Sequence, residues 1–366
     1  MSLNLVADRL IKGRIYPSLA RHQALPYTQA WREFGQHWPN TIPIRLQEYC
    51  DHHGVALNIY DINDFPDNCF YPIGLGFFDF SIDYFGLLPT KVFGSVFSRE
   101  LKILFYYHEG DDPHQIKQRL DGLANVYKLD PDCYVFVSGN TAARNLPNFV
   151  YFTDFELWYY QRNRASPPLA IHHEPRERDF TVLNRLHKSW RALAMADLKS
   201  QHLLDNSYWS YCETGEFVDA DCPIEIDYFP GLRAYTKEFL KSAPYVSDEL
   251  DHDQRNDHST LIAKYHVNSY CNIVLETHFD ADQSGGAFLT EKTFKPIKHG
   301  QMFFIAGPAG SLQVLRDLGY RVFDRILDNR YDLEQDHTQR WLKLTQAINS
   351  ARLKLPQLFE LCRTDI

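Results

Sequence analysis

The sequence has few cysteines and no long apolar run, and both absences exclude classes of protein. Its seven cysteines are dispersed over 366 residues without a Cys-x-x-Cys pair, which argues against a disulfide framework and against a zinc cage. No stretch reaches the roughly 18 apolar residues that a membrane-spanning helix needs. The N-terminal residues meet a charge at Asp8, so we expect no secretory signal and a cytoplasmic protein. The Walker motif and the Gly-x-Gly-x-x-Gly loop are also missing.

The net charge is −9, and no basic run interrupts the acidic composition. Proteins that follow a nucleic-acid backbone usually carry a basic face, so intact duplex DNA is a disfavoured partner. Aromatic residues are plentiful, with 25 Phe and 22 Tyr. We expect most of them in the core, although aromatic rings can also form walls against which sugars or bases stack.

Strand and helix patterns alternate in two halves of the chain. The first half contains predicted strands at 54–60, 101–107, 133–137 and 148–152, and predicted helices at 43–50 and 113–127. Asp112 is the expected N-cap of the helix at 113–127, and Pro113 occupies its first position. The second half contains predicted strands at 180–183, 208–211, 271–276, 302–305 and 320–323, and helices at 187–203, 311–318 and 334–362.

This alternation predicts an α/β fold with two Rossmann-like domains and a C-terminal helix, because strand–helix–strand units of this length pair in parallel. A polar, proline-containing stretch around 165–178 separates the two halves. The predicted domains are residues 1–170 and 171–345, followed by a terminal helix over 346–366.

The segment Thr290-Glu-Lys-Thr293 opens a predicted helix after a glycine-bearing loop. Thr290 is a good N-cap, and the free amides and dipole of a helix start favour an anion. Lys292 is mildly unfavourable against that dipole, which indicates a bound anion nearby. Glu291 could accept hydrogen bonds from ribose hydroxyls. An ordinary capped surface helix would show the same residues.

A second cluster follows the predicted strand at 180–183. Asn184 comes at its end, and Arg191 lies near the start of the next helix. Open α/β sheets bind ligands at the carboxyl ends of their strands. A guanidinium there matches two oxygens of a diphosphate. A surface arginine and a capping asparagine would leave the same pattern.

Together these clusters resemble the C-terminal domain of the α1,3-fucosyltransferase family and related GT-B glycosyltransferases. The resemblance covers about residues 180–310 and rests on the order of four features: Asn184 with Arg191, Asn272-Ile-Val-Leu-Glu276, Thr290-Glu-Lys292, and Phe303-Phe-Ile-Ala-Gly-Pro308. It implies the GT-B architecture, in which two Rossmann-like domains face a cleft. Residues 171–345 would bind a nucleotide sugar, and residues 1–170 would lie on the acceptor side.

By position, the resemblance also implies roles within the donor site. Arg191 and Lys292 would bind the donor diphosphate, and Glu291 would hold the ribose. Asn184, Glu276 and Thr290 would complete the donor site. Thr277 stands where the family has asparagine, and the sequence predicts neither the sugar nor the base of the donor.

Transfer of a sugar to an acceptor hydroxyl needs a base, which in this architecture comes from the first domain. Glu109, in His108-Glu-Gly-Asp-Asp112 after the strand at 101–107, is the predicted base, and His108 is the second candidate. A solvated loop carboxylate would fit Glu109 equally well. Asp-x-Asp pairs such as Asp280-Ala-Asp282 make a weak magnesium site, so we expect no metal and no cofactor.

The sequence therefore predicts a metal-independent glycosyltransferase that uses a nucleotide-diphosphate sugar as co-substrate. The acceptor stays open, and a glycan, a protein or a modified nucleobase would each be compatible. Two alternatives remain: a non-catalytic nucleotide- or glycan-binding protein of the same fold, and another α/β transferase that acts on nucleotides.

Overall fold

The computed structural model of the chain describes residues 2–7, 46, 50–51, 53–75, 78–162, 175–185, 187–211, 231–246, 262–279 and 285–365. The chain divides into two compact units, of which unit 1 comprises Met1–Trp158 and Asp282–Gly286, and unit 2 comprises Tyr159–Ala281 and Ala287–Ile366. The division follows residue 158, twelve residues before the predicted boundary at 170. Among the described residues, no helix is both long enough and apolar enough to cross a membrane.

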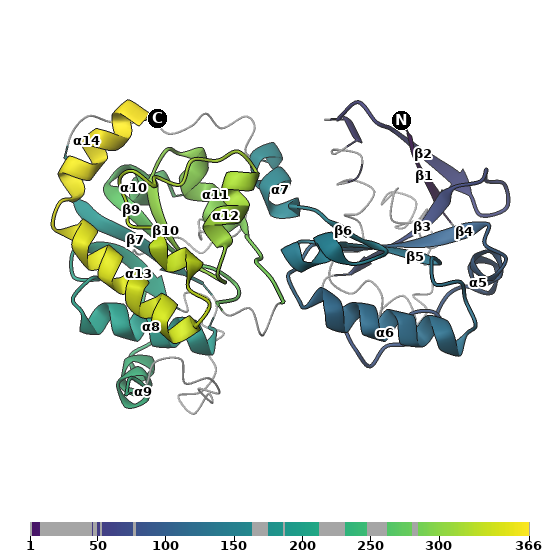
Figure 1. Cartoon of the computed structure of the whole chain (residues 1–366), viewed down its shortest axis with the longest axis horizontal. Helices are drawn as coiled ribbons and strands as arrows, with labels where there is room; N and C mark the ends of the chain where they lie inside the picture. Colours follow the sequence, from purple (N-terminus) through teal and green to yellow (C-terminus); the bar gives the residue numbers. More distant parts are fainter. Residues whose placement is uncertain are drawn as a thin grey trace. The chain divides into compact units, whose positions relative to one another are not determined.

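Unit 1 is built on a six-stranded parallel sheet with the strand order β2-β1-β3-β4-β5-β6 (Figure 1). Its strands are β1 (Ser2–Ala7), β2 (Ala56–Asp61), β3 (Cys69–Leu75), β4 (Leu101–Tyr107), β5 (Tyr134–Ser138) and β6 (Phe149–Tyr151). Its helices are α5 (Thr90–Phe97), α6 (Pro113–Val126) and the short 3-10 helix η1 (Thr141–Asn145), and α7 (Asp154–Arg162) begins in this unit. Figure 1 shows α6 lying along one face of the sheet.

The central strand β4 shows why this sheet is buried on both faces. Ile103 and Phe105 pack into one apolar cluster, whereas Leu104 and Tyr106 belong to a second cluster on the opposite face. Successive side chains of a strand point to opposite faces, so an almost continuous apolar run requires a cover on each side. The run at 101–107 therefore predicts this strand correctly, with the same bounds as the structure.

Unit 2 is built on a four-stranded parallel sheet with the order β10-β9-β7-β8. Its strands are β7 (Arg178–Asn184), β8 (Ser207–Tyr211), β9 (Ser269–Leu275) and β10 (Met302–Ala306). Its helices are α8 (Ser189–Ser200), α9 (Arg233–Lys241), α10 (Ala263–Val267), α11 (Glu291–Lys298), α12 (Ser311–Asp317), α13 (His337–Arg352), α14 (Leu355–Asp365) and the 3-10 helix η3 (Arg330–Leu333).

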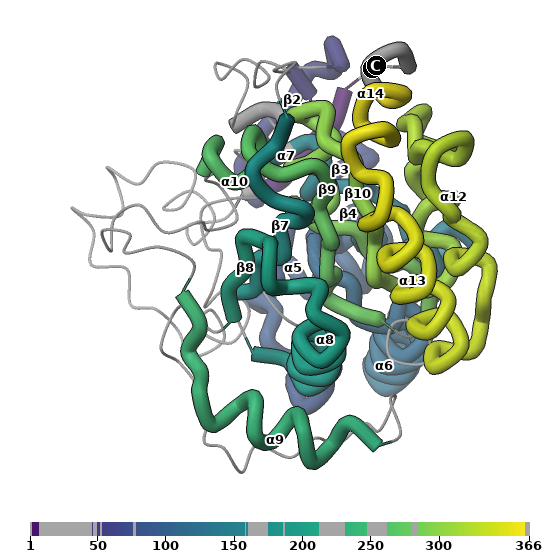
Figure 2. The backbone as a smooth tube through the Cα atoms, turned by 90° about the vertical axis from the view of Figure 1, so that its left-hand side faces the viewer, coloured from purple at the N-terminus to yellow at the C-terminus, as the bar shows by residue number. Residues whose placement is uncertain are grey.

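Helix α13 lies beside α8, as Figure 2 shows. Trp341 donates from its indole nitrogen to Asp197 Oδ2 at 2.6 Å, and Asn349 donates to Gln201 Oε1 at 2.7 Å. These two bonds join the C-terminal part of the chain to the helix that follows β7. They hold the C-terminal end of α8 against α13.

The strand order places a topological switch point between β7 and β9. From β7 the chain moves outward to β8 on one side, and then to β9 and β10 on the other side. Thr181 pairs with Asn272, so the same register three residues further on places Asn184 opposite Leu275. Open α/β sheets bind ligands outside the carboxyl ends of their strands at such a point. The fold therefore brings Asn184 close to Glu276, which directly follows β9.

Two sequence predictions fail in unit 2. The segment 320–323 is not a strand, and Phe323 adopts a φ of 60°, which is incompatible with extended backbone. The helix predicted over 334–362 is two helices, α13 and α14, with a break at Leu353 and Lys354. Pro356 lies in the first turn of α14, where a proline belongs because its missing amide is not needed there.

Other differences concern unit 1. Sequence analysis missed strand β1, and it predicted only irregular structure with short strands over 64–90, because proline and glycine interrupt the apolar residues of β3. Most of the helix predicted at 43–50 lies outside the described residues.

Helix α6 begins at the predicted cap and offers a direct test. Asp112 Oδ1 accepts a hydrogen bond from the amide of His114 at 2.9 Å, and Pro113 occupies the first helical position. We expect Asp112→Ala to lower the free energy of unfolding of unit 1 by about 1 kcal/mol, because a helix-start amide loses its acceptor. Urea denaturation followed by circular dichroism measures this loss.

Asp132→Ala is the matched control, because Asp132 is an exposed loop carboxylate of the same unit. It should leave the denaturation midpoint unchanged. Equal losses in the two variants would show that the capping bond contributes nothing specific.

Candidate functional site

Glu276 organises the carboxyl edge of the sheet in unit 2. Its side chain is 0% exposed. Oε1 accepts hydrogen bonds from the Thr290 amide at 3.0 Å and from Thr293 Oγ1 at 2.6 Å. Oε2 accepts from Thr290 Oγ1 at 2.7 Å and from the Thr277 amide at 3.2 Å. A carboxylate removed from water needs such donors, and here they fix the start of α11 against the end of β9.

The start of α11 has the predicted cap. Thr290 Oγ1 accepts from the Lys292 amide at 3.4 Å, and the Lys292 ammonium turns back to the same oxygen at 2.9 Å. Glu291 lies 3.3 Å from that ammonium. Burial raises the pKa of Glu291, but Lys292 and Lys295 outweigh it, and the pKa ends below its ordinary value. Glu291 is therefore an ionised group paired with cations of its own helix.

Side chains from the start of α8 hold the loop that follows β9. Arg191, which is 3% exposed, donates from Nε and Nη2 to the Glu276 carbonyl oxygen at 3.1 and 2.7 Å. Lys188 Nζ and Trp190 Nε1 donate to the Thr277 carbonyl oxygen at 3.2 and 3.3 Å. The loop backbone and the first turn of α8 thus form one hydrogen-bonded assembly.

Two buried polar atoms lie at the ends of neighbouring strands. Asn184, at the end of β7, donates from Nδ2 to the sulfur of Met195 at 3.3 Å. Its Oδ1 and the hydroxyl of Ser210 in β8 are buried and have no hydrogen-bond partner within the described part of the chain. Such atoms are rare in native proteins, which marks this edge as a place that suits a water molecule or a polar ligand group.

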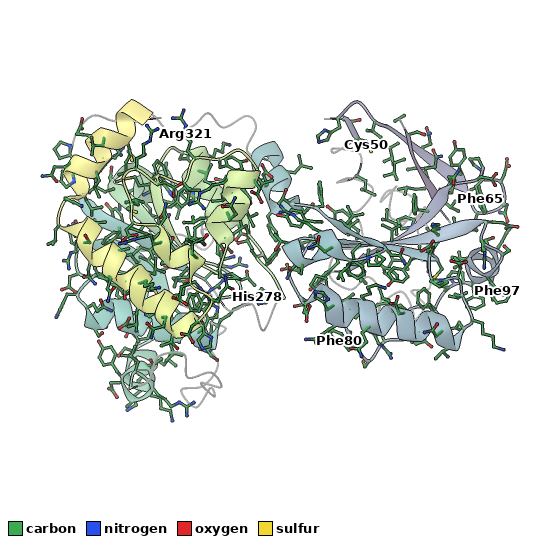
Figure 3. All side chains as sticks on the ribbon, viewed as in Figure 1. Cys50, Phe65, Phe80, Phe97, His278 and Arg321 are labelled. Atoms are coloured by element: carbon green, nitrogen blue, oxygen red, sulfur yellow. The ribbon has the colours of Figure 1, made fainter. Side chains whose placement is uncertain are left out.

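The charges of three cations act on His278, a residue that Figure 3 labels. Burial is the largest cause that lowers the pKa of His278, and the charges of Lys188, Arg191 and Lys292 lower it further, to about 3. The ring is therefore neutral at physiological pH. A group of cations beside the N-terminus of a helix suits an anion of more than one charge.

All six predicted donor residues lie in unit 2, around this sheet edge. They reach it from three directions: Asn184 ends β7, Arg191 lies on α8, and Glu276, Thr290, Glu291 and Lys292 lie between the end of β9 and the first turn of α11. Both carboxylate oxygens of Glu276 accept hydrogen bonds from within the protein, so Glu276 positions the neighbouring residues. Lys292 is the most exposed of the cations that the sequence predicts here, with 28% of its side chain accessible.

The two predicted bases lie in unit 1, directly after β4. His108 is buried, and its Nε2 lies 3.5 Å from Glu109 Oε1. The His108 ring also packs against Phe155, with ring centroids 5.6 Å apart. Glu109 is about one-third exposed, which leaves its carboxylate accessible to solvent.

Sequence analysis missed Lys188 and His278. Lys188 precedes α8 directly, and a lysine at a helix start beside Arg191 is a signal that could have found it. His278 comes two residues after Glu276 in the loop that follows β9. Its importance depends on which side chains surround it, and that information comes from the fold.

Within the described residues, no group of three or more His, Cys, Asp or Glu side chains is arranged to hold a metal ion. The pair Asp280 and Asp282 lies outside those residues. The cations of the candidate site instead favour a negatively charged ligand.

Comparison of the chain with protein-family models, with curated proteins and with solved structures finds no match. The resemblance to the α1,3-fucosyltransferase family therefore stays a prediction from the motifs. The geometry of the sheet edge is independent of that resemblance, because it follows from the hydrogen bonds and charges described above.

The hydrogen bonds of Glu276 predict the effect of a single-atom change. Glu276→Gln replaces one acceptor oxygen by an amide donor, which then faces a donor pair inside a buried site. We expect the free energy of unfolding of unit 2 to fall by about 2 kcal/mol, because buried donors lose their acceptors. Chemical denaturation followed by tryptophan fluorescence measures the change.

Glu238→Gln is the control, because Glu238 is an exposed carboxylate on α9 whose ion pair with Lys241 should contribute little. Thr293→Val, which removes one of the four donors, should give an intermediate loss. A Glu276 variant no less stable than the Glu238 variant would contradict the organising role of Glu276.

Proposed function

We propose that this protein is a metal-independent glycosyltransferase that moves a sugar from a nucleotide-diphosphate sugar to an acceptor hydroxyl. One observation carries the proposal: at the switch point of the unit 2 sheet, beside the N-terminus of α11, Lys188 and Arg191 donate to the backbone of the loop after β9, and the charge of Lys292 acts on the same loop at His278. A diphosphate provides the charge and the spread of oxygen atoms that such a cluster would bind.

The chemistry of glycosyl transfer gives this cluster a catalytic use. As the bond between the sugar carbon and the diphosphate breaks, its electron pair moves to the diphosphate oxygen, and the leaving group gains negative charge. Fixed cations bind the leaving group more strongly than the intact donor, and this difference lowers the barrier. Arg191 is held by the Glu276 carbonyl group, and Lys292, which is 28% exposed, is held by Thr290 and Glu291.

The remaining parts of the proposal come from the resemblance. The GT-B arrangement would place an acceptor against the first domain, with Glu109 or His108 as the base that takes the acceptor proton. The acceptor can be a glycan, a protein or a modified nucleobase. A non-catalytic nucleotide-binding protein, or another transferase acting on nucleotides, would use the same cation cluster, so the experiments must separate binding from turnover.

A thermal-shift screen over nucleoside diphosphates tests the donor site. We expect UDP or GDP to raise the melting temperature more than ATP or NAD, because a ligand that binds the native state stabilises it. Lys292→Ala should weaken the affinity for that diphosphate about 10-fold to 100-fold, the effect of losing one charge-assisted hydrogen bond. Isothermal titration calorimetry on the folded variant measures the loss.

Lys298→Ala is the matched control, because Lys298 lies in the last turn of the same helix. It should bind the diphosphate as the unaltered protein does. Absence of any response to diphosphates would overturn the proposal.

Turnover is tested with the nucleotide sugar of the diphosphate that binds. Release of nucleoside diphosphate, alone or with added glycan acceptors, supports a transferase, and binding without release over a full acceptor panel supports the non-catalytic alternative. Glu109→Gln should keep donor binding and lose transfer if Glu109 is the base. If that variant transfers normally, the base is a different residue, and His108→Gln is the next variant to measure.

A further inference from the structure

The loop after β9 carries the neutral imidazole of His278 near a cluster of cations, where a bound diphosphate would also lie. We propose that His278 is a fourth contact of the bound diphosphate and that it takes up a proton when the diphosphate binds. This inference rests on the proposed function, since it requires a diphosphate in the cation cluster.

Hydrogen bonds on both sides of His278 fix its position. The carbonyl group of Thr277 accepts from Lys188 and Trp190, as described above. The carbonyl group of Phe279 accepts from the guanidinium of Arg340, and the Phe279 ring stacks on Trp190 with centroids 5.2 Å apart. A loop held at the residue before and the residue after fixes the backbone of His278 beside the start of α8.

The charged groups around His278 come from two helices. Lys188 and Arg191 belong to the start of α8, and Lys292 belongs to α11. The segment before α11 contributes the uncharged ring of Phe288, 6.1 Å from the imidazole. Lysine and arginine side chains ordinarily carry their charge between about pH 5 and pH 8.

Other titratable groups at this sheet edge are already engaged. The carboxylate of Glu276 accepts hydrogen bonds from threonines and backbone amides, and Glu291 pairs with Lys292. His187 shares a hydrogen bond of 2.6 Å with Tyr211, and burial lowers the pKa of His187. Among these groups, His278 is the one whose pKa is lowered by the same three cations that would hold the phosphate oxygens.

The expected change follows from the charges alone. In the free protein, burial and the three cations hold the pKa of His278 at about 3, so the imidazole is neutral at physiological pH. A bound diphosphate brings two negative charges to the same place, offsets the cations, and raises the pKa. A group whose pKa rises on binding takes up a proton, so affinity must increase as the pH falls towards the pKa of the complex.

The protonated ring would also serve the proposed transfer. When the electron pair of the breaking bond moves to the diphosphate oxygen, an imidazolium beside that oxygen can transfer its proton to it and become neutral again. The neutral state in the free protein would keep the site from accumulating a fourth positive charge before the donor arrives.

The test uses dimethyl diphosphate, with one methyl ester on each phosphate group, because its two charges do not change between about pH 5 and pH 8. Carbon-13 labelling of the histidine ring makes each imidazole visible by NMR, and His278→Asn identifies the His278 signal. We expect that signal to titrate near about pH 6.5 in the complex, roughly 3.5 pH units higher than in the free protein, and the affinity to be about tenfold tighter at pH 5.5 than at pH 7.5.

Two variants separate the outcomes. His278→Asn should bind the probe with an affinity that no longer depends on pH, and His202→Gln, at an exposed position two residues after α8, should keep the full pH dependence. If the probe binds but the His278 signal keeps its free-state titration, this inference fails and the proposed function stands. If the probe does not bind at either pH, the proposed diphosphate site fails as well.

Discussion

Four hydrogen bonds converge on the buried carboxylate of Glu276, and the geometry of the sheet edge in unit 2 depends on them. They join the end of β9 to the first turn of α11. The backbone of Glu276 accepts from Arg191 and so adds α8 to the same assembly. A carboxylate can accept more hydrogen bonds than any neutral side chain of its size, which explains why one residue can hold three elements together.

The donors of Glu276 are hydroxyls and amides, and this choice has an electrostatic consequence. Within the described residues no salt bridge joins Glu276 to a cation, although Arg191 lies close enough to be stabilised by its charge. Arg191 is instead bound to a carbonyl oxygen, whose partial charge offsets only part of a full positive charge. A diphosphate would complement the charge that Arg191 retains.

The sequence predicts well those parts of the structure that depend on neighbouring residues. The apolar run 101–107 is strand β4, and Asp112 and Thr290 cap the helices that follow them. It predicts poorly what depends on distant partners. Asn184 lies near Glu276 because β7 and β9 pair in parallel. The register of that pairing cannot be predicted from neighbouring residues in the sequence. The importance of His278 likewise comes from side chains on two helices that lie before and after it in the chain.

Lys292 shows how a contribution to the stability of the fold can be distinguished from a contribution to binding the proposed ligand. Its described contacts, with Thr290 and Glu291, lie within its own helical turn, and it adds a cation where the helix dipole disfavours one. Such a residue adds little to the stability of the fold. Departures from local preference are expected where a site serves a ligand, because the binding energy of the ligand offsets the cost. Arg191 differs, since it also supports the loop after β9, so its charge alone is weaker evidence for a ligand than the charge of Lys292.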